Sequence, residues 1–199
     1  MLKTEHDIYE LVRGDVRMMR VLQQAASLEL PDWWIGAGFL RNRVWDELCG
    51  NAPADDGCDV DLAYFDPADT RPEHDWKLEE HARKLFPNVC WEIRNQARFG
   101  ESDGYESYTS CADGIAHWPE TASAIGARLR SNGELELLFT HGIDDLLRLV
   151  ARPVTNNGVS APMDLVLERV EKKGWCHRWP DLRVRQPEAP QPEAPGPFG

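Results

Sequence analysis

The segment "DVDLAYFD", residues 59–66, places two aspartates one residue apart at the start of an otherwise apolar run. Successive side chains of a β-strand point to opposite faces, so Asp59 and Asp61 share one face, while Val60 and Leu62 point to the other. Two neighbouring carboxylates repel each other unless a positive group lies between them. Either a cation binds to this pair, or both carboxylates are solvated at the end of a strand.

The residues before this segment have the pattern of a strand, a glycine turn and a helix. "WWIGAGFL", residues 33–40, begins as an apolar strand and continues into Gly36 and Gly38. Glycine lets the backbone approach a ligand closely, and the free N–H groups at a helix N-terminus attract phosphate. Arg41 and Asn42 follow in the first turn, where an arginine can hold a triphosphate through paired hydrogen bonds. The structural alternative is that the glycines only form a tight turn and that Arg41 is a solvated surface residue.

A third strand is predicted at "NVCWEIRNQA", residues 88–97, with Glu92 and Arg94 on one face. Carboxylate oxygens suit Mg²⁺, which takes few protein ligands in addition to substrate phosphates. Asp59, Asp61 and Glu92 together can hold two such ions about 3.5–4 Å apart, the arrangement used for in-line displacement at phosphorus. The structural alternative leaves Glu92 exposed and paired with Arg94.

The N-terminal pattern predicts helices on either side of these strands. Thr4 and Asp7 have the spacing of a helix cap, and apolar residues then recur at helical spacing in one amphipathic helix that ends near Leu30. A charged helical segment is expected over residues 73–86. Helices and strands therefore alternate through the first hundred residues.

The C-terminal half predicts a hairpin and two helices. Residues 125–139 contain two alternating runs around the turn signal Ser-Asn-Gly, which is typical of a β-hairpin. A short helix is expected within residues 142–150, capped by the side chain of Asp144. A last helix is expected to begin at Pro162 and to stop at Gly174. Its apolar face is predicted from Met163, Val166, Leu167 and Val170.

The composition limits the function classes. A length of 199 residues suits one domain, or one domain with a small subdomain. A net charge of −12 argues against a large nucleic-acid footprint, because nucleic-acid binders usually carry a basic surface. The five cysteines are scattered without a CxxC pair and no signal peptide is evident, so they are expected to be reduced thiols in a cytoplasmic protein. No apolar stretch approaches membrane-spanning length.

The order of these motifs resembles the nucleotidyltransferase superfamily, whose members share a strand–GG/GS–helix unit followed by a strand with D-x-D. The segment "AGFLRN" looks like the G-G-A-V-R-D segment of the poly(A) polymerase and CCA-adding relatives. Over residues 33–179 the chain is similar to a bacterial nucleotidyltransferase-like family with WWIGAGF-RN, D-[IV]-D, NQAR, WPETA and D-D-L motifs. Here these motifs are residues 33–42, 59–61, 95–98, 118–122 and 144–146.

The resemblance implies an α/β (α+β) fold: a nucleotidyltransferase-type palm with a small mixed sheet flanked by helices, plus a C-terminal helical segment. It implies one domain over residues 1–185, with the palm core at about 30–100 and the hairpin and helical part at about 101–185. The Pro-rich composition of residues 186–199, with its tandem QPEAP, predicts a disordered tail. The resemblance also implies metal and catalytic roles for Asp59, Asp61 and Glu92, and nucleotide-binding roles for Gly36, Gly38, Arg41 and Asn42. Ala37 departs from the motif, since it replaces the first glycine of GG.

The expected activity is metal-dependent transfer of NMP from an NTP such as ATP to a hydroxyl acceptor, with release of pyrophosphate. Mg²⁺ is the expected cofactor, and a small molecule or a protein is the expected acceptor. The alternative is a non-catalytic nucleotide sensor or interaction protein on the same fold, which would bind nucleotide without releasing pyrophosphate. A metal-dependent phosphohydrolase is a third option, and it would turn over nucleotide without labelling an acceptor.

Overall fold

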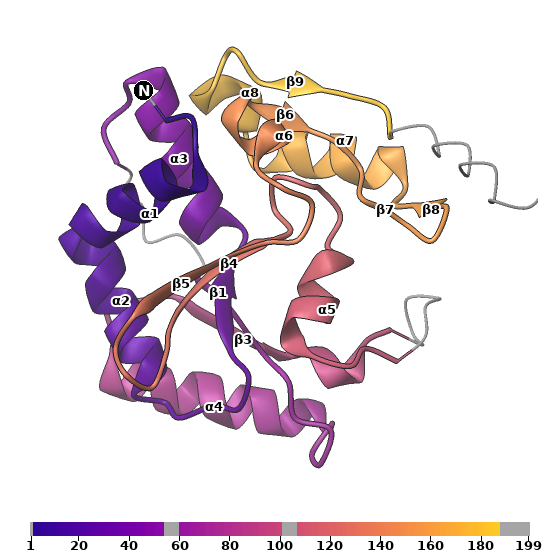
Figure 1. The fold of residues 1–199 in the computed structure, drawn as a ribbon. Coiled ribbons are helices and arrows are strands. Elements are labelled where there is room, and N and C mark those ends of the chain that lie inside the picture. Colours follow the sequence, from indigo (N-terminus) through magenta and orange to yellow (C-terminus); the bar gives the residue numbers. More distant parts are fainter. Residues whose placement is uncertain (1, 54–59, 101–106, 188–199) are drawn as a thin grey trace, which may run out of the picture.

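The computed structural model describes residues 2–53, 60–100 and 107–187, and its centre is a five-stranded sheet (Figure 1). The strands, in the order β3-β2-β1-β4-β5, are β1 (Trp34–Gly36), β2 (Val60–Tyr64), β3 (Trp91–Asn95), β4 (Ile125–Leu129) and β5 (Leu135–Phe139). β2 and β3 are parallel, and the other neighbouring pairs are antiparallel. This mixed sheet with flanking helices confirms the predicted α/β (α+β) fold.

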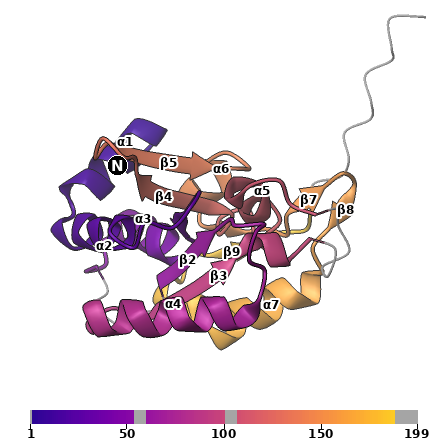
Figure 2. The same cartoon turned by 90° about the horizontal axis from the view of Figure 1, so that it is seen from below.

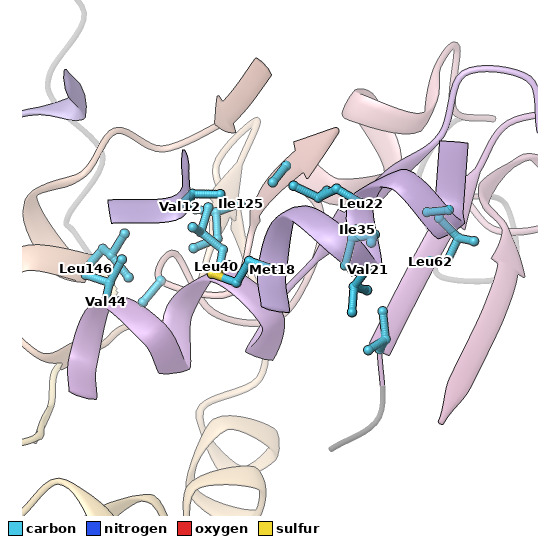
Figure 3. Close-up of a cluster of buried hydrophobic side chains, with 14 of the residues drawn as sticks. Val12, Met18, Val21, Leu22, Ile35, Leu40, Val44, Leu62, Ile125 and Leu146 are labelled. Carbon is cyan, nitrogen blue, oxygen red and sulfur yellow. The ribbon is translucent and has the colours of Figure 1, made fainter. Parts of the chain in front are cut away.

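Four helices cover one face of the sheet and its β3 edge: α1 (Glu5–Gly14), α2 (Val16–Ala26), α3 (Gly38–Cys49) and α4 (Pro72–Leu85). Figure 3 shows how apolar side chains of α2 and α3 meet those of the strands, among them Leu40, Ile35 and Leu62. Burying each such side chain stabilises the fold by about 1.5–3 kcal/mol. α4 lies beside β3 (Figure 2), and its Glu79 Oε1 accepts a hydrogen bond from the Ile93 N–H at 3.0 Å.

The opposite face of the sheet is covered by the short helix α5 (Cys111–Ala116), which follows the 3₁₀ turn η1 (Gln96–Arg98) along the chain. A second, smaller apolar cluster joins α5 to this face through Trp34, Ala63, Cys111 and Ile115. Because α5 is short, part of this face is left for polar residues.

The C-terminal elements gather at one end of the sheet (Figure 1). They are α6 (Asp144–Leu147), β6 (Val150–Ala151), β7 (Thr155–Asn156), β8 (Val159–Ser160), α7 (Met163–Lys172), α8 (Trp175–Arg178) and β9 (Arg183–Val184). Their attachment to α3 is specific. The buried Asp46 carboxylate accepts hydrogen bonds from Arg178 Nη2 at 2.7 Å and Trp179 Nε1 at 2.9 Å. Trp45 packs edge-on against Trp179.

The predicted single N-terminal helix is wrong, because the chain breaks at Asp15 into α1 and α2. The Asp15 carboxylate accepts hydrogen bonds from the N–H groups of Arg17 and Met18, both at 3.0 Å, and so caps α2. The cap predicted at Thr4 and Asp7 is confirmed as a reciprocal capping box. The break lets both helices place apolar residues on the same core, so helical periodicity continues across it.

Two details of the C-terminal prediction are also wrong. Asp144 is the first residue of α6 and makes no side-chain cap, because Ile143 occupies the N-cap position. Leu167 is 46% exposed, although Val166 and Val170 of the same helix are buried. Gly174 does end α7, but α8 follows it directly, so α7 is not the last helix.

Some predicted features lie outside the described residues. They include Asp59 and the Pro-rich tail from residue 188 onward. Within residues 2–53, 60–100 and 107–187, no helix has both the length and the apolar character needed to cross a membrane.

Candidate functional site

Two of the predicted carboxylates lie side by side on neighbouring strands. Asp61 of β2 is the register partner of Glu92 of β3 in the parallel ladder. Register partners point to the same face of a sheet, and the residues next to them, Leu62 and Ile93, are buried on the helix-covered face. Asp61 and Glu92 therefore project to the opposite face, where both line a cavity of about 530 Å³.

The cavity has a polar floor and two walls. The floor comes from β2 and β3, and it includes Arg94 as well as the two carboxylates. One wall comes from η1, α5 and the segments beside them: Gln96, Phe99, Tyr108, Gly114, His117, Trp118 and Pro119. In this wall the rings of Tyr108 and His117 stack at 4.8 Å between centroids. The other wall comes from α7 and the residues before it: Ala161, Pro162, Leu165 and Arg169.

The environment of Asp61 disfavours its charge. Burial, and next the neighbouring Glu92 carboxylate, raise the pKa of Asp61 from 3.8 to about 6, although Lys173, Arg41 and Arg169 act in the opposite direction. Among the described residues, no hydrogen bond or ion pair reaches the Asp61 carboxylate. Asp61 is partly buried, and a divalent cation stabilises a partly buried carboxylate that lies beside a second one, so this pair of oxygen ligands fits Mg²⁺.

The described residues hold no group of three or more His, Cys, Asp or Glu side chains that could bind a metal. Asp61 and Glu92 therefore supply two carboxylates, and Asp59 lies outside the described part of the chain. Mg²⁺ commonly keeps one or two protein carboxylates and fills its other positions with phosphate and water oxygens. Two carboxylates are compatible with that pattern.

Glu92 also has a structural partner. Its Oε1 lies 3.2 Å from Arg94 Nη2, and its side chain is 45% exposed. Arg94 in turn pairs with Glu79 of α4. The position of Glu92 is therefore compatible with two roles: a metal ligand in the cavity, or a partly exposed residue paired with Arg94.

The glycine turn between β1 and α3 reaches the cavity through Ala37. Ala37 is the N-cap of α3, with φ 47° and ψ −120° and no side-chain cap, and it lines the cavity. This backbone conformation is one that glycine adopts far more readily than alanine. Ala37 brings the start of α3 to the cavity margin, and α3 has no side-chain cap; the N-terminus of a helix favours phosphate.

Gly36 is needed for close packing. A Cβ atom at Gly36 would lie 2.4 Å from Trp118 Cζ3, so only glycine admits the indole ring. Trp118 lines the cavity and donates through Nε1 to Gln96 Oε1 at 3.2 Å. Gly36 therefore shapes the cavity wall. Gly38 is the first residue of α3, and a Cβ there would meet Asn42 Nδ2 at 3.4 Å.

Arg41 is buried beside the cavity, at 3% exposure. Its Nη1 donates to Ser123 Oγ at 2.6 Å and its Nη2 to Asn42 Oδ1 at 2.9 Å. Its guanidinium also lies 4.0 Å from the Trp175 ring centroid. Neither Arg41 nor Asn42 is among the described residues that line the cavity. The nucleotide-binding roles of Gly36, Gly38, Arg41 and Asn42 stay predictions.

Two residues of the site were not anticipated from the sequence. Arg169 of α7 lines the cavity, and its Nε donates to the fully buried Glu120 at 2.6 Å. Glu120 belongs to the WPETA motif, for which the sequence favours a structural role as a turn that caps a helix. The only local signal for Arg169 was a basic residue in an amphipathic helix, and nothing in that pattern connects it to β2.

Comparison with known proteins agrees with this architecture. Residues 23–184 match a family model described as a nucleotidyltransferase. A solution NMR structure, described as revealing a CCA-adding enzyme head domain, is 32% identical, with a TM-score of 0.81 over 94% of this chain and 98% of that one. A comparison with curated proteins gave no match.

A more distant structure, a CCA-adding enzyme in complex with ATP, is 16% identical with a TM-score of 0.52. It covers 89% of this chain but only 42% of that chain, so the similarity concerns the fold of one part of that enzyme. The family match covers most of the present chain and the NMR structure aligns over nearly all of it. The chain belongs to the nucleotidyltransferase family.

Proposed function

We propose that the protein transfers NMP from a nucleoside triphosphate to a hydroxyl acceptor and releases pyrophosphate. The observation that carries this proposal is the pairing of Asp61 with Glu92 on the cavity floor, beside the uncapped N-terminus of α3. Carboxylates from neighbouring strands and a phosphate-attracting helix end are the two elements that a metal–nucleotide complex requires.

In this reaction Asp61 and Glu92 would hold Mg²⁺, with Asp59 as a further ligand. When bound, the ion would neutralise charge on the triphosphate. The acceptor hydroxyl oxygen attacks the α-phosphorus in line and loses its proton to solvent, a new P–O bond forms, and the bond to pyrophosphate breaks. The protein contributes positioning and electrostatic stabilisation, which dominate catalysis of phosphoryl transfer.

The acceptor is proposed to be a small molecule or a protein. The net charge of −12 opposes attachment to a long polyphosphate backbone. The cavity of about 530 Å³ lies within the range of about 300–1,000 Å³ typical of small-molecule sites.

The test is incubation of the protein with Mg²⁺, NTPs labelled at the α-phosphate and a metabolite extract, followed by mass spectrometry of labelled products. We expect a nucleotidylated product and equimolar pyrophosphate. Asp61→Asn should lower the rate at least 100-fold, and Glu92→Gln should lower it less. Glu136→Gln is the matched control, because Glu136 is a strand carboxylate of the same sheet that pairs with Arg128 and Arg130. Full activity of Asp61→Asn would refute the assignment.

A second candidate is nucleotide binding without transfer. It is favoured by the burial of Arg41 against Ser123 and Trp175, which keeps this arginine from the cavity lining. Under this alternative, calorimetry would detect binding of Mg²⁺–NTP, but no pyrophosphate would appear with any acceptor.

A further inference from the structure

The WPETA motif connects the cavity to the C-terminal helices. Trp118 packs on Gly36, and Glu120 accepts a hydrogen bond from Arg169 Nε at 2.6 Å. Thr121 Oγ1 donates to Asp145 at 2.8 Å. One short segment thus fixes the turn before α3, the start of the D-D-L helix and a cationic side chain of α7.

The Glu120–Arg169 ion pair joins the WPETA segment to α7, and forming it requires removing a carboxylate from water. Glu120 is 0% exposed, and its Oε2 is buried without a hydrogen-bond partner among the described residues. A buried carboxylate with one unsatisfied oxygen carries a desolvation cost, and an apolar pair of similar volume is often at least as stable. Stability therefore does not explain the pair, and a functional reason for a fixed arginine is indicated.

Arg169 is oriented so that most of its donors remain available. Its Nε is bound to Glu120, and among the described residues the guanidinium has no other hydrogen-bond or ion-pair partner. Its side chain is 30% exposed and lines the cavity. The two Nη groups of such a held guanidinium can donate four hydrogen bonds in one plane, which matches phosphate oxygens.

Arg94, the other arginine among the described residues that line the cavity, is already neutralised. Arg94 donates to Glu79 and to the Ile93 carbonyl, and it pairs with Glu92. Arg169 faces the floor from the α7 wall, and it is near enough for its charge to lower the pKa of Asp61. A polyphosphate between α7 and the β2–β3 floor would therefore meet a metal on one side and Arg169 on the other.

We propose that Arg169 binds the pyrophosphate part of the nucleoside triphosphate, the β- and γ-phosphates, and that Glu120 is a positioning residue that holds the Arg169 guanidinium toward the cavity. This inference rests on the proposed function, since it names a phosphate-binding residue of the same site. It gives the WPETA motif a role, because Glu120 lies within that motif.

The test compares ligands that contain or lack these phosphates. Binding of Mg²⁺–ATP, Mg²⁺–pyrophosphate and AMP is measured by calorimetry for the wild type, Arg169→Gln, Arg169→Lys and Lys172→Ala. Arg169→Gln should weaken ATP and pyrophosphate binding at least tenfold and leave AMP binding unchanged, and Arg169→Lys should restore part of the loss. Lys172 is the matched control, because it lies on the same helix and pairs with the exposed Glu168.

Glu120→Gln tests the positioning role separately. It should weaken ATP binding in the wild-type background and have no further effect in Arg169→Gln, because two residues acting through one contact are not additive. Additive effects of the two substitutions would show that Glu120 acts independently of Arg169. That result would overturn the positioning role.

The outcomes separate the two proposals. If the wild type binds Mg²⁺–ATP and Arg169→Gln binds it equally well, this inference is wrong while the proposed function stands. If Arg169→Gln weakens AMP as much as ATP, Arg169 does not act on the pyrophosphate part, and the inference is again wrong. If the wild type does not bind Mg²⁺–ATP, the proposed function fails and this inference fails with it. Circular dichroism of each variant confirms that it is folded.

Discussion

Asp61 and Glu92 lie opposite each other in the parallel β2–β3 ladder, and both line the cavity on the face away from the main core. Burial and this neighbour raise the pKa of Asp61 to about 6. This geometry makes the charged form of Asp61 unfavourable in the metal-free protein, and it underlies the proposal that a divalent cation binds there. Metal binding and pH should therefore be coupled.

Metal-free Asp61→Asn should be more stable than the wild type at neutral pH. The pKa of Asp61 is about 6 in the folded protein and about 3.8 in the unfolded chain, so above pH 6 the fold must hold a charge that it disfavours. The asparagine variant avoids this cost, which is at most about 3 kcal/mol. Its advantage should shrink as the pH falls from 6 to 4 and disappear below pH 4. Urea denaturation in EDTA across this range measures it.

Glu136 provides a control, because its pKa is shifted downward, whereas the pKa of Asp61 is shifted upward. Hydrogen bonds from Arg130 and then Arg128 lower the pKa of Glu136 from 4.5 to about 2. Its charged form stabilises the fold above pH 4.5, so Glu136→Gln should lose stability at neutral pH and regain parity as the pH falls toward 2. A pH-independent difference for Asp61→Asn would contradict the assigned environment of Asp61.

Magnesium should stabilise the wild type and not Asp61→Asn. A ligand that binds only the folded state raises the free energy of unfolding by RT ln(1 + [L]/Kd), or about 2.7 kcal/mol at a concentration 100 times Kd. Because the ion binds the deprotonated carboxylate, the effect should grow as the pH rises through 6. The melting temperature with MgCl₂ against EDTA measures it. An equal shift in both proteins would place the ion elsewhere.

Gly36→Ala should destabilise the protein by about 1–3 kcal/mol, the usual range for an overpacked core. The new Cβ would lie 2.4 Å from the Trp118 ring, so the indole must move from its place in the cavity wall. Adding Trp118→Leu to Gly36→Ala should recover part of the lost stability, because the second substitution removes the clashing ring. Gly14→Ala is the control, since no atom lies within 4 Å of a Cβ there and alanine is the better helix former. Chemical denaturation compares the four proteins.

Ala37→Gly should raise the free energy of unfolding by about 1 kcal/mol. Alanine at φ 47° and ψ −120° carries about 1–3 kcal/mol of backbone strain, of which glycine removes most, while greater freedom of the unfolded chain offsets about 0.5–1 kcal/mol. Ala26→Gly, in the last turn of α2, should instead be destabilising. A destabilised Ala37→Gly would show that the turn is not strained.

Local pattern was sufficient for most elements of the palm-like sheet. The alternation around Glu92 correctly predicted β3, and the Ser-Asn-Gly turn correctly predicted the β4–β5 hairpin. The pattern of a strand, a glycine turn and a helix correctly predicted α3. The break at Asp15 was missed because apolar spacing continues across it. The exposure of Leu167 was missed because an amphipathic pattern does not state how wide the buried face is.

The sequence was sufficient to identify Asp61 and Glu92 as candidate ligands. Strand periodicity places each carboxylate on the face of the sheet opposite to that of its apolar sequence neighbours. Their adjacency depends on the parallel register of β2 and β3, which no local pattern specifies. The folded chain alone shows that Arg169 reaches the same cavity and that Glu120 holds it. The reason is physical: periodicity reports which side of one element is apolar, whereas contacts between residues far apart in the chain depend on how whole elements pack.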